Sequence, residues 1–331
     1  MRPLLFLLLA GLAVAGCDST DIGEFSEKVV VSGTLIAGEP LGSVELGLSR
    51  PIGDVFDSGE ARVEDGVVTV SLLDANGAVE ESTAYEYVGG QNPLYLPVGD
   101  NLPLVLPGRT YRLDVVVPGT PERRLTAQTT VPEALDLVEP PPDRIPYLAG
   151  QGPSLRLSES TAQPRRAVFL FSVRALEPLQ FQRVAVEGET RYRSVPETGF
   201  PLVPSRFVFG DCVVEGTESI VCEQDPHEFT QGSSPLLNQE SYENLGDGTL
   251  RVNVPWLAFG YYGPAELSLA SVDDAIVDFF ETQAVQFAPT TLSPGEIPNI
   301  VSNVEGGLGF FGSIAQVRTT IFIEAGAESP F

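Results

Sequence analysis

Apolar and polar side chains alternate along much of this chain with a period of two, which is typical of half-buried β-strands. Because successive side chains of a strand point to opposite faces, such segments place one apolar face on a core and one polar face toward water. The alternation is clearest over residues 44–48, 68–72, 111–117, 125–131, 250–256 and 317–323. We therefore predict a mainly β protein built from antiparallel sheets.

Two local signals organise the N-terminal strands. Asp74-Ala75-Asn76-Gly77 separates two alternating segments, and Asn-Gly is the strongest signal for a two-residue hairpin turn with positive φ at both positions. The segment VLPGRTY (105–111) is similar to the tyrosine corner of Greek-key sandwiches, in which a Tyr hydroxyl bonds the backbone a few residues upstream. These signals predict an immunoglobulin-like β-sandwich over residues 29–135.

The amino-acid composition of the chain changes after Pro132. Five prolines in EPPPDRIPYLAGQGP (139–153) predict a linker over residues 136–160, because proline favours extended backbone without ladder pairing. A crossover that skirts the edge of a sheet is the alternative. A second β-rich domain, sandwich or barrel-like, is expected over 161–325, with RAVFLFSV (166–173) as a strand buried on both faces.

One helix is predicted near residues 272–284. Ser271 is the expected cap, and Asp273 and Asp274 fall in the first turn, where the helix dipole favours negative charge. The apolar positions 275, 276, 279 and 280 recur at helical spacing and predict a stripe that packs on the second sheet. A partner-binding helix is the alternative.

The glycine-rich segment 298–312 has neither a strand nor a helix period. We predict that it is ordered, packs its backbone closely and closes the second domain with Phe310 or Phe311 buried. The alternative is a docking surface with both rings exposed.

The first sixteen residues have the pattern of a lipoprotein signal peptide. Arg2 precedes an apolar core and small residues, and Val14-Ala15-Gly16-Cys17 is similar to a lipobox. We expect Cys17 to carry the lipid and residues 17–28 to form an acidic, flexible tether. An ordinary signal peptide with a chance cysteine is the alternative. These features predict a lipid-anchored protein of the cell envelope, held at the outer membrane on its periplasmic face or at the cell surface.

Charge and cysteine content limit the classes of ligand that the chain can bind and the bonds that its cysteines can form. The chain has 19 basic and 45 acidic residues, a net charge of −26, which disfavours nucleic acids and anionic lipid surfaces as ligands. With Cys17 lipidated, Cys212 and Cys222 remain as an even pair in an oxidising compartment, and we predict a disulfide. A zinc site is disfavoured because His227 is the only histidine.

No catalytic residue, metal or cofactor is assigned. Residues 307–312 fit GxGxxG, but the β-branched segment that follows indicates a strand where a dinucleotide site needs a helix. No hydrolase motif frames His227. The concentrated aromatic residues are candidates for a binding surface, with core packing as the alternative: Trp256, Tyr261, Tyr262, Phe310 and Phe311.

Four segments together resemble the DUF4249 family. IPNIVSNVEGGLGFFGSI (297–314) is similar to the family's C-terminal block, VVVSGTL to its start, and GRTYRLDV (108–115) and TTVPEALDL (129–137) to segments between them. The resemblance implies a Bacteroidota-type cell-envelope lipoprotein, often encoded near TonB-dependent receptors, with no catalytic residues to carry over. The acidity and the cysteine pair depart from the family pattern.

The sequence therefore predicts a non-enzymatic, outer-membrane-associated lipoprotein that acts as an accessory or binding partner of a TonB-dependent receptor in nutrient uptake. Two other classes stay open. An aromatic-lined groove would favour a stand-alone carbohydrate- or peptide-binding module. A cleft that holds His227 beside a buried carboxylate would favour a hydrolase of unknown type.

Overall fold

The computed structural model describes most of the 331-residue chain. The described residues are 25–51, 61–89, 94–119, 121–150, 152–158, 168–176, 181–186, 189–194, 212–215, 219–223, 225, 231–237, 241–287 and 301–324. Cys17 and His227 lie outside them. The predicted mainly β fold is confirmed, and its large sheets are consistent with β-sandwich domains.

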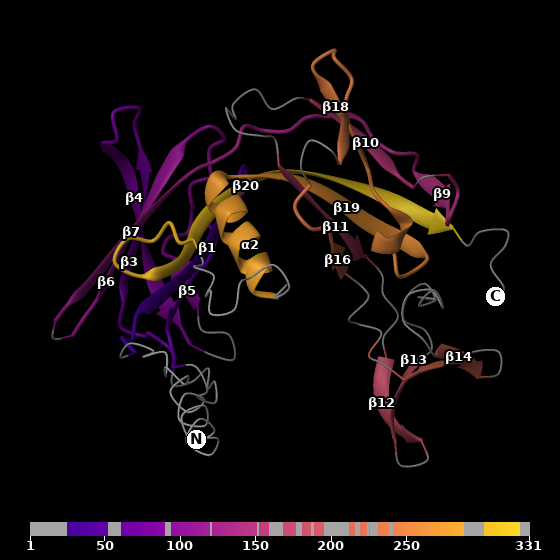
Figure 1. Cartoon of the computed structure of the whole chain (residues 1–331), viewed down its shortest axis with the longest axis horizontal. Helices are drawn as coiled ribbons and strands as arrows, with labels where there is room; N and C mark the ends of the chain where they lie inside the picture. The colour runs from indigo at the N-terminus through magenta and orange to yellow at the C-terminus, as the bar shows by residue number, and fades with distance from the viewer. Residues whose placement is uncertain are drawn as a thin grey trace, which may run out of the picture.

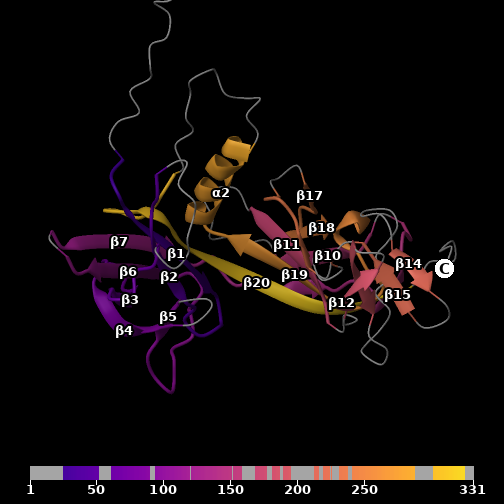
Figure 2. The same ribbon diagram turned by 90° about the horizontal axis from the view of Figure 1, so that it is seen from below.

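The first seven strands form a curled sheet around one apolar core, which we call the first core (Figures 1 and 2). Their order in the sheet is β1-β2-β5-β4-β3-β6-β7, with every pairing antiparallel. The alternating apolar positions predicted within these strands face this core. The strands are β1 (Val29–Ile36), β2 (Val44–Leu48), β3 (Val67–Leu73), β4 (Val79–Val88), β5 (Leu94–Pro97), β6 (Thr110–Val117) and β7 (Arg123–Thr130).

A second core lies between the strands of the other half of the same sheet and a four-stranded sheet. The four-stranded sheet has the order β17-β18-β10-β8, and β11 joins the large sheet between β16 and β19. The elements are β8 (Leu137–Glu139), β9 (Arg144–Pro146), β10 (Ser154–Ser158), β11 (Phe169–Ala175), β16 (Gln231–Ser233), β17 (Tyr242–Asn244), β18 (Thr249–Asn253), a 3-10 helix η2 (Trp256–Ala258) and β19 (Gly263–Val272).

Residues 136–160 are not the linker without ladder pairing that we expected. They contain β8, β9 and β10, and Leu155 and Leu157 of β10 are fully buried in the second core. The prolines at 140–142 fall between β8 and β9, where no ladder donor is needed. The proline content predicted this loop correctly, but it gave no indication of the short strands β8 and β9 on either side of it.

The last strand of the large sheet, β20 (Leu308–Glu324), belongs to both cores. Residues 308–314 of β20 pair with β1 in parallel, with Val31 opposite Gly309. Residues 314–323 pair with β19 in antiparallel orientation. Figure 1 shows this yellow strand running from the indigo strands of the first core to the orange strands of the second. The prediction of antiparallel sheets is therefore wrong at the β1–β20 pairing and at the β20–β9 pairing, which is also parallel.

The glycine-rich segment is ordered and closely packed over its described part, as predicted, but it closes the first core. Phe311 is 0% exposed and lies in the first core, because β20 enters that core beside β1. Gly309 has φ +101°, and a Cβ there would lie 1.9 Å from the Val31 carbonyl oxygen. Only glycine permits this approach. Residues 308–312 are therefore the start of a strand rather than a loop.

Helix α2 (Asp274–Phe287) confirms the predicted helix, but the cap is different. Asp273 Oδ1 accepts a hydrogen bond from Ile276 N at 2.9 Å, which makes Asp273 the N-cap. Ser271 is the penultimate residue of β19, and its buried hydroxyl has no hydrogen-bond partner in the described part of the chain. Ile276 packs beside β20 as the predicted stripe requires, whereas Phe280, which was predicted to belong to the same stripe, is 46% exposed.

The predicted hairpin and tyrosine corner are both present. Gly77 has φ +81°, whereas Asn76 keeps a negative φ, so only one of the two positions expected to be positive is so. Asp74 Oδ1 explains the difference, because it accepts from the N–H groups of both Asn76 and Ala78 and holds the turn. These two bonds also lower the pKa of the Asp74 carboxyl.

A small separate sheet carries the two remaining cysteines. Its order is β12-β13-β15-β14, and Cys212 of β14 stands directly opposite Cys222 of β15. Antiparallel partners have Cα atoms about 4.5–5.5 Å apart, within the range that a disulfide needs. The strands are β12 (Phe181–Val186), β13 (Glu189–Ser194), β14 (Cys212–Glu215) and β15 (Ser219–Cys222).

This register supports the disulfide, which stays a prediction. We expect mass spectrometry of non-reduced, exported protein to show one intramolecular link between the peptides that contain Cys212 and Cys222. A Cys222→Ser variant should lose the linked peptide. Two free thiols in the exported wild-type protein would contradict the disulfide.

Candidate functional site

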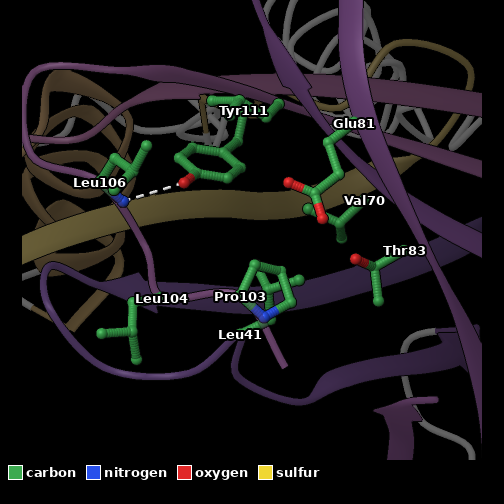
Figure 3. A pocket seen from close by; sticks show the side chains of 9 residues that line it. Leu41, Val70, Glu81, Thr83, Pro103, Leu104, Leu106 and Tyr111 are labelled. Atoms are coloured by element: carbon green, nitrogen blue, oxygen red, sulfur yellow. Dashed lines mark hydrogen bonds between the residues drawn. The ribbon is translucent and has the colours of Figure 1, made fainter. Parts of the chain in front are cut away.

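An apolar pocket of about 240 Å³ opens on the module that surrounds the first core (Figure 3). Strand β3 supplies part of its wall, β4 a second part and the segment between β5 and β6 a third. Pockets that combine an apolar lining with few polar groups are the usual sites of ligand binding. The lining residues are Leu41, Val70, Leu72, Glu81, Thr83, Pro103, Leu104, Leu106 and Tyr111.

The tyrosine corner holds one wall of the pocket in place. The Tyr111 hydroxyl accepts a hydrogen bond from Leu106 N at 2.9 Å, as the sequence predicted (Figure 3). Val105 N donates to Glu39 O at 2.8 Å, and Gly38 N donates to Val105 O at the same distance. Burial raises the pKa of the Tyr111 hydroxyl, so this group stays protonated. The wall is therefore fixed by the fold and does not need a ligand to form.

Aliphatic side chains at the rim of the pocket remain open to solvent. Leu104 is 54% exposed and Leu106 is 41% exposed, although Val70 and Tyr111 at the same pocket are buried. Single exposed leucines are common on protein surfaces, but two beside a preformed apolar pocket make it the candidate contact surface. An apolar group that enters the pocket would cover both.

Two polar side chains face the same pocket. Alternation along β4 puts Glu81 and Thr83 on the face that looks toward the core, and Figure 3 shows both pointing toward the pocket. Glu81 forms no ion pair or hydrogen bond among the described residues, whereas its neighbour Glu80 binds the Arg109 guanidinium at 2.6 Å. Arg109 also donates to the Leu73 carbonyl at 3.0 Å. The nearby guanidinium of Arg109 is therefore already paired with Glu80.

A more polar pocket of about 270 Å³ lies beside the second core, next to the prolines at 140–142. Two arginines line it, but both have acidic partners: Arg156 binds Asp247 at 2.6 Å and Arg251 binds Glu243 at 3.0 Å. An anion would have to displace these carboxylates. This pocket is therefore the weaker candidate.

A buried polar cluster joins the two halves of the molecule. Its members are Thr129 of β7, Ser313 of β20 and Asp273 at the start of α2, all less than 9% exposed. Asp273 Oδ2 accepts from the Thr129 hydroxyl and, at 3.3 Å, from the Ser313 hydroxyl. Burial raises the pKa of the Asp273 carboxyl to about 6, although these hydrogen bonds act in the opposite direction. The cluster lies inside the protein, where its hydrogen bonds link β7, β20 and the start of α2.

The sequence pattern of one protein family decides where this chain belongs. The model of the family described as "Domain of unknown function (DUF4249)" matches residues 18–320. The chain belongs to the DUF4249 family. No curated protein matches this DUF4249 chain.

Solved structures resemble the DUF4249 chain only weakly. Trypsin-activated alpha-2-macroglobulin from Escherichia coli matches at 11% identity over 90% of this chain and 16% of that chain, with a TM-score of 0.21. The three N-terminal domains of the outer capsid protein Hoc of bacteriophage RB49 match at 9% identity over 90% and 70% of the two chains, with a TM-score of 0.20. Salmonella alpha-2-macroglobulin reacted with methylamine matches at 12% identity over 90% and 15%, with a TM-score of 0.19.

The DUF4249 chain thus spans about a sixth of the length of these macroglobulins. With TM-scores near 0.2, none of the three supports an argument about fold or function.

The aromatic residues predicted as a binding surface do not form one. Trp256 and Tyr261 are buried in the second core, and Tyr262 packs edge-on against Tyr147. Phe311 is buried in the first core, and Phe310 is half-buried against Phe279 of α2, with ring centroids 4.7 Å apart. Burial of large apolar area outweighs exposure for such rings, so the packing alternative is correct for Trp256, Tyr261 and Phe311.

The other predicted features fall partly outside the described residues. Cys17 and His227 lie outside the described residues, whereas Cys212 and Cys222 are brought together by their strands. Among the described side chains, no three of His, Cys, Asp or Glu gather as a metal site would require. No helix in the described part has the length and apolar character needed to cross a bilayer.

Sequence reasoning missed the pocket and the Asp273 cluster. Neither has a motif, because their members come from segments that are distant along the chain. The tyrosine corner was the one usable signal, since it fixes the segment that carries Leu104 and Leu106.

Proposed function

We propose that this DUF4249 chain is a non-enzymatic lipoprotein of the cell envelope that binds a protein partner at the outer membrane. The apolar pocket with the exposed Leu104 and Leu106 at its rim is the observation that carries the proposal. The lipobox around Cys17 supports the anchor, and the family resemblance supports a TonB-dependent receptor as the partner.

The anchor would place the pocket near the membrane surface. A chain held by two or more acyl groups stays on the bilayer, because each buried methylene contributes about 0.8 kcal/mol. The partner would then meet the pocket at a high effective concentration, so that a modest apolar contact is sufficient. A small pocket with two exposed leucines fits this role better than it fits tight binding from solution.

The anchor itself is testable. A Cys17→Ala change should abolish incorporation of labelled fatty acid and leave the precursor uncleaved after Gly16, because no thiol remains to be modified. Metabolic labelling and the mass of the N-terminal peptide would check both results. Fatty-acid labelling that survives in the Cys17→Ala protein would contradict the lipoprotein assignment.

Docking at the pocket has its own test. A Leu104→Asp change puts a charge where the partner's apolar group would lie, and we expect it to reduce cross-linking to the receptor in intact envelopes at least tenfold. Leu148→Asp is the matched control, since Leu148 is also exposed but lies outside the pocket. Equal cross-linking in all three proteins would remove the pocket from the proposal.

The alternative of a carbohydrate-binding module gains no support from the described residues. Sugar recognition by stacking needs exposed rings, and Trp256, Tyr261 and Phe311 are buried. Glu81 and Thr83 at an aliphatic pocket are better suited to a peptide segment of a protein partner.

A further inference from the structure

The lone carboxylate in the apolar pocket limits what can fill it. Glu81 lines the same pocket as Leu72 and Leu104 and has no ion pair or hydrogen bond among the described residues. In the free protein water solvates this exposed carboxylate. An occupant that covers the leucines would also remove part of that water, and covering an unpaired charge is unfavourable.

From this juxtaposition we propose that the pocket binds a peptide segment of the partner in which a lysine or arginine lies next to an aliphatic residue. The aliphatic side chain enters between Leu41, Val70 and Tyr111, and the cation pairs with Glu81. The inference rests on the proposed function, because it specifies the chemistry of the partner at the same pocket.

Charges around the pocket favour this occupant. Glu80 and Arg109 neutralise each other at 2.6 Å, so Glu81 leaves the site with one unbalanced negative charge. Glu81 and Thr83 offer acceptor oxygens, and an ammonium has three donors while a guanidinium has five. The net charge of −26 on the whole chain also attracts a basic segment and repels an acidic one.

The size of the pocket favours a side chain over a whole domain surface. A volume of about 240 Å³ accommodates one or two side chains, with the peptide backbone passing over the rim formed by Leu104 and Leu106. Two adjacent anchors, one apolar and one charged, give such a short segment both affinity and register.

Peptide selection on the full chain in detergent micelles tests the proposal. A random heptapeptide phage library is panned on the wild-type protein and on Glu81→Gln, Leu104→Asp and Glu86→Gln variants. Glu86 is the matched control, because it lies on the opposite face of β4 and outside the pocket. Unfolding midpoints of the variants establish that each is folded.

We expect the wild-type protein and Glu86→Gln to enrich peptides with Lys or Arg beside Leu, Ile or Val. Glu81→Gln should keep the aliphatic enrichment and lose the basic one, and Leu104→Asp should lose the aliphatic one. For a dye-labelled peptide from this set, replacement of its lysine by norleucine should weaken binding to the wild type roughly three- to tenfold. High salt should reduce that difference by screening the ion pair.

Other outcomes would distinguish a failure of this inference from a failure of the proposed docking site. Aliphatic enrichment without a basic preference, or a basic preference that survives Glu81→Gln, would overturn the inference and leave docking at the pocket intact. Enrichment that is absent, or unchanged by Leu104→Asp, would overturn both the inference and the proposed docking site.

Discussion

Replacement of Phe311 by alanine should lower the free energy of unfolding by about 3–5 kcal/mol, the cost typical of removing a fully buried ring. Phe311 is 0% exposed and lies in the first core, where β20 runs beside β1. Asn303 fixes the backbone at this point, because its side-chain amide accepts from Phe311 N at 3.0 Å and donates to Phe311 O at 2.8 Å. With both backbone groups held, the chain cannot shift to fill the cavity.

Urea unfolding followed by circular dichroism would measure this loss. Phe280→Ala is the matched control, because the same ring is removed from a side chain that is 46% exposed, and we expect it to cost about 1 kcal/mol or less. A Phe311→Ala protein as stable as the Phe280→Ala protein would show that Phe311 does not close the first core.

The second large effect should come from Asp273. We expect the stability of an Asp273→Asn variant, relative to the wild type, to rise by about 2–3 kcal/mol when the pH is raised from about 4 to about 7. Burial raises the pKa of this carboxyl to about 6 in the folded protein, from its ordinary value of 3.8. The folded state therefore binds the proton more tightly than the unfolded state does.

The sign follows from that difference. The stabilisation from the raised pKa is fully present below about pH 4, where the carboxyl is protonated in both states, and it is lost as the pH rises through about 6. Asparagine does not titrate in this range. Its amide oxygen can still accept a hydrogen bond from Ile276 N, and its NH₂ group can donate to the hydroxyls of Thr129 and Ser313. The variant therefore keeps the helix cap without the buried charge.

The hydroxyls of Thr129 and Ser313 favour the charged form of Asp273, because both donate to its Oδ2. Burial favours the neutral form and is the larger effect, so the pKa is raised.

Comparison of urea unfolding at several pH values would test this prediction. Asp278→Asn is the control, because Asp278 is exposed on the same helix and loses the same charge. Titration of the other carboxyl groups cancels when each variant is compared with the wild type at each pH. A difference between Asp273→Asn and the wild type that is constant from pH 4 to 7 would contradict a buried, titrating Asp273.

Local patterns were sufficient to predict the local structure. Alternation located β2, β3, β6 and β7 because each has one face on a core, and the tyrosine corner followed from the sequence around Pro107 and Tyr111. Helical spacing found α2, although both Ser271 and Asp273 have side chains suited to a cap. The choice between them depended on where β19 ended, which the pattern did not show.

Long-range pairing could not be predicted in the same way. The parallel alignment of β1 with β20 joins residues 278 positions apart, such as Val30 and Leu308, and no turn signal connects them. Without it, Phe311 was assigned to the wrong core. The pocket was missed for the same reason, since Leu41, Glu81 and Leu104 meet only after the sheet has curled.

The sharing of β20 between the two cores determines when the protein can finish folding. When β1 emerges during synthesis, its parallel neighbour is still 278 residues away, which at about 5–20 residues per second is a delay of roughly 15–55 s. Throughout that delay one side of β1 has an unpaired row of backbone N–H and C=O groups, a template for pairing with another chain. The need for chaperones should therefore be greatest for chains that have not yet received residues 308–324.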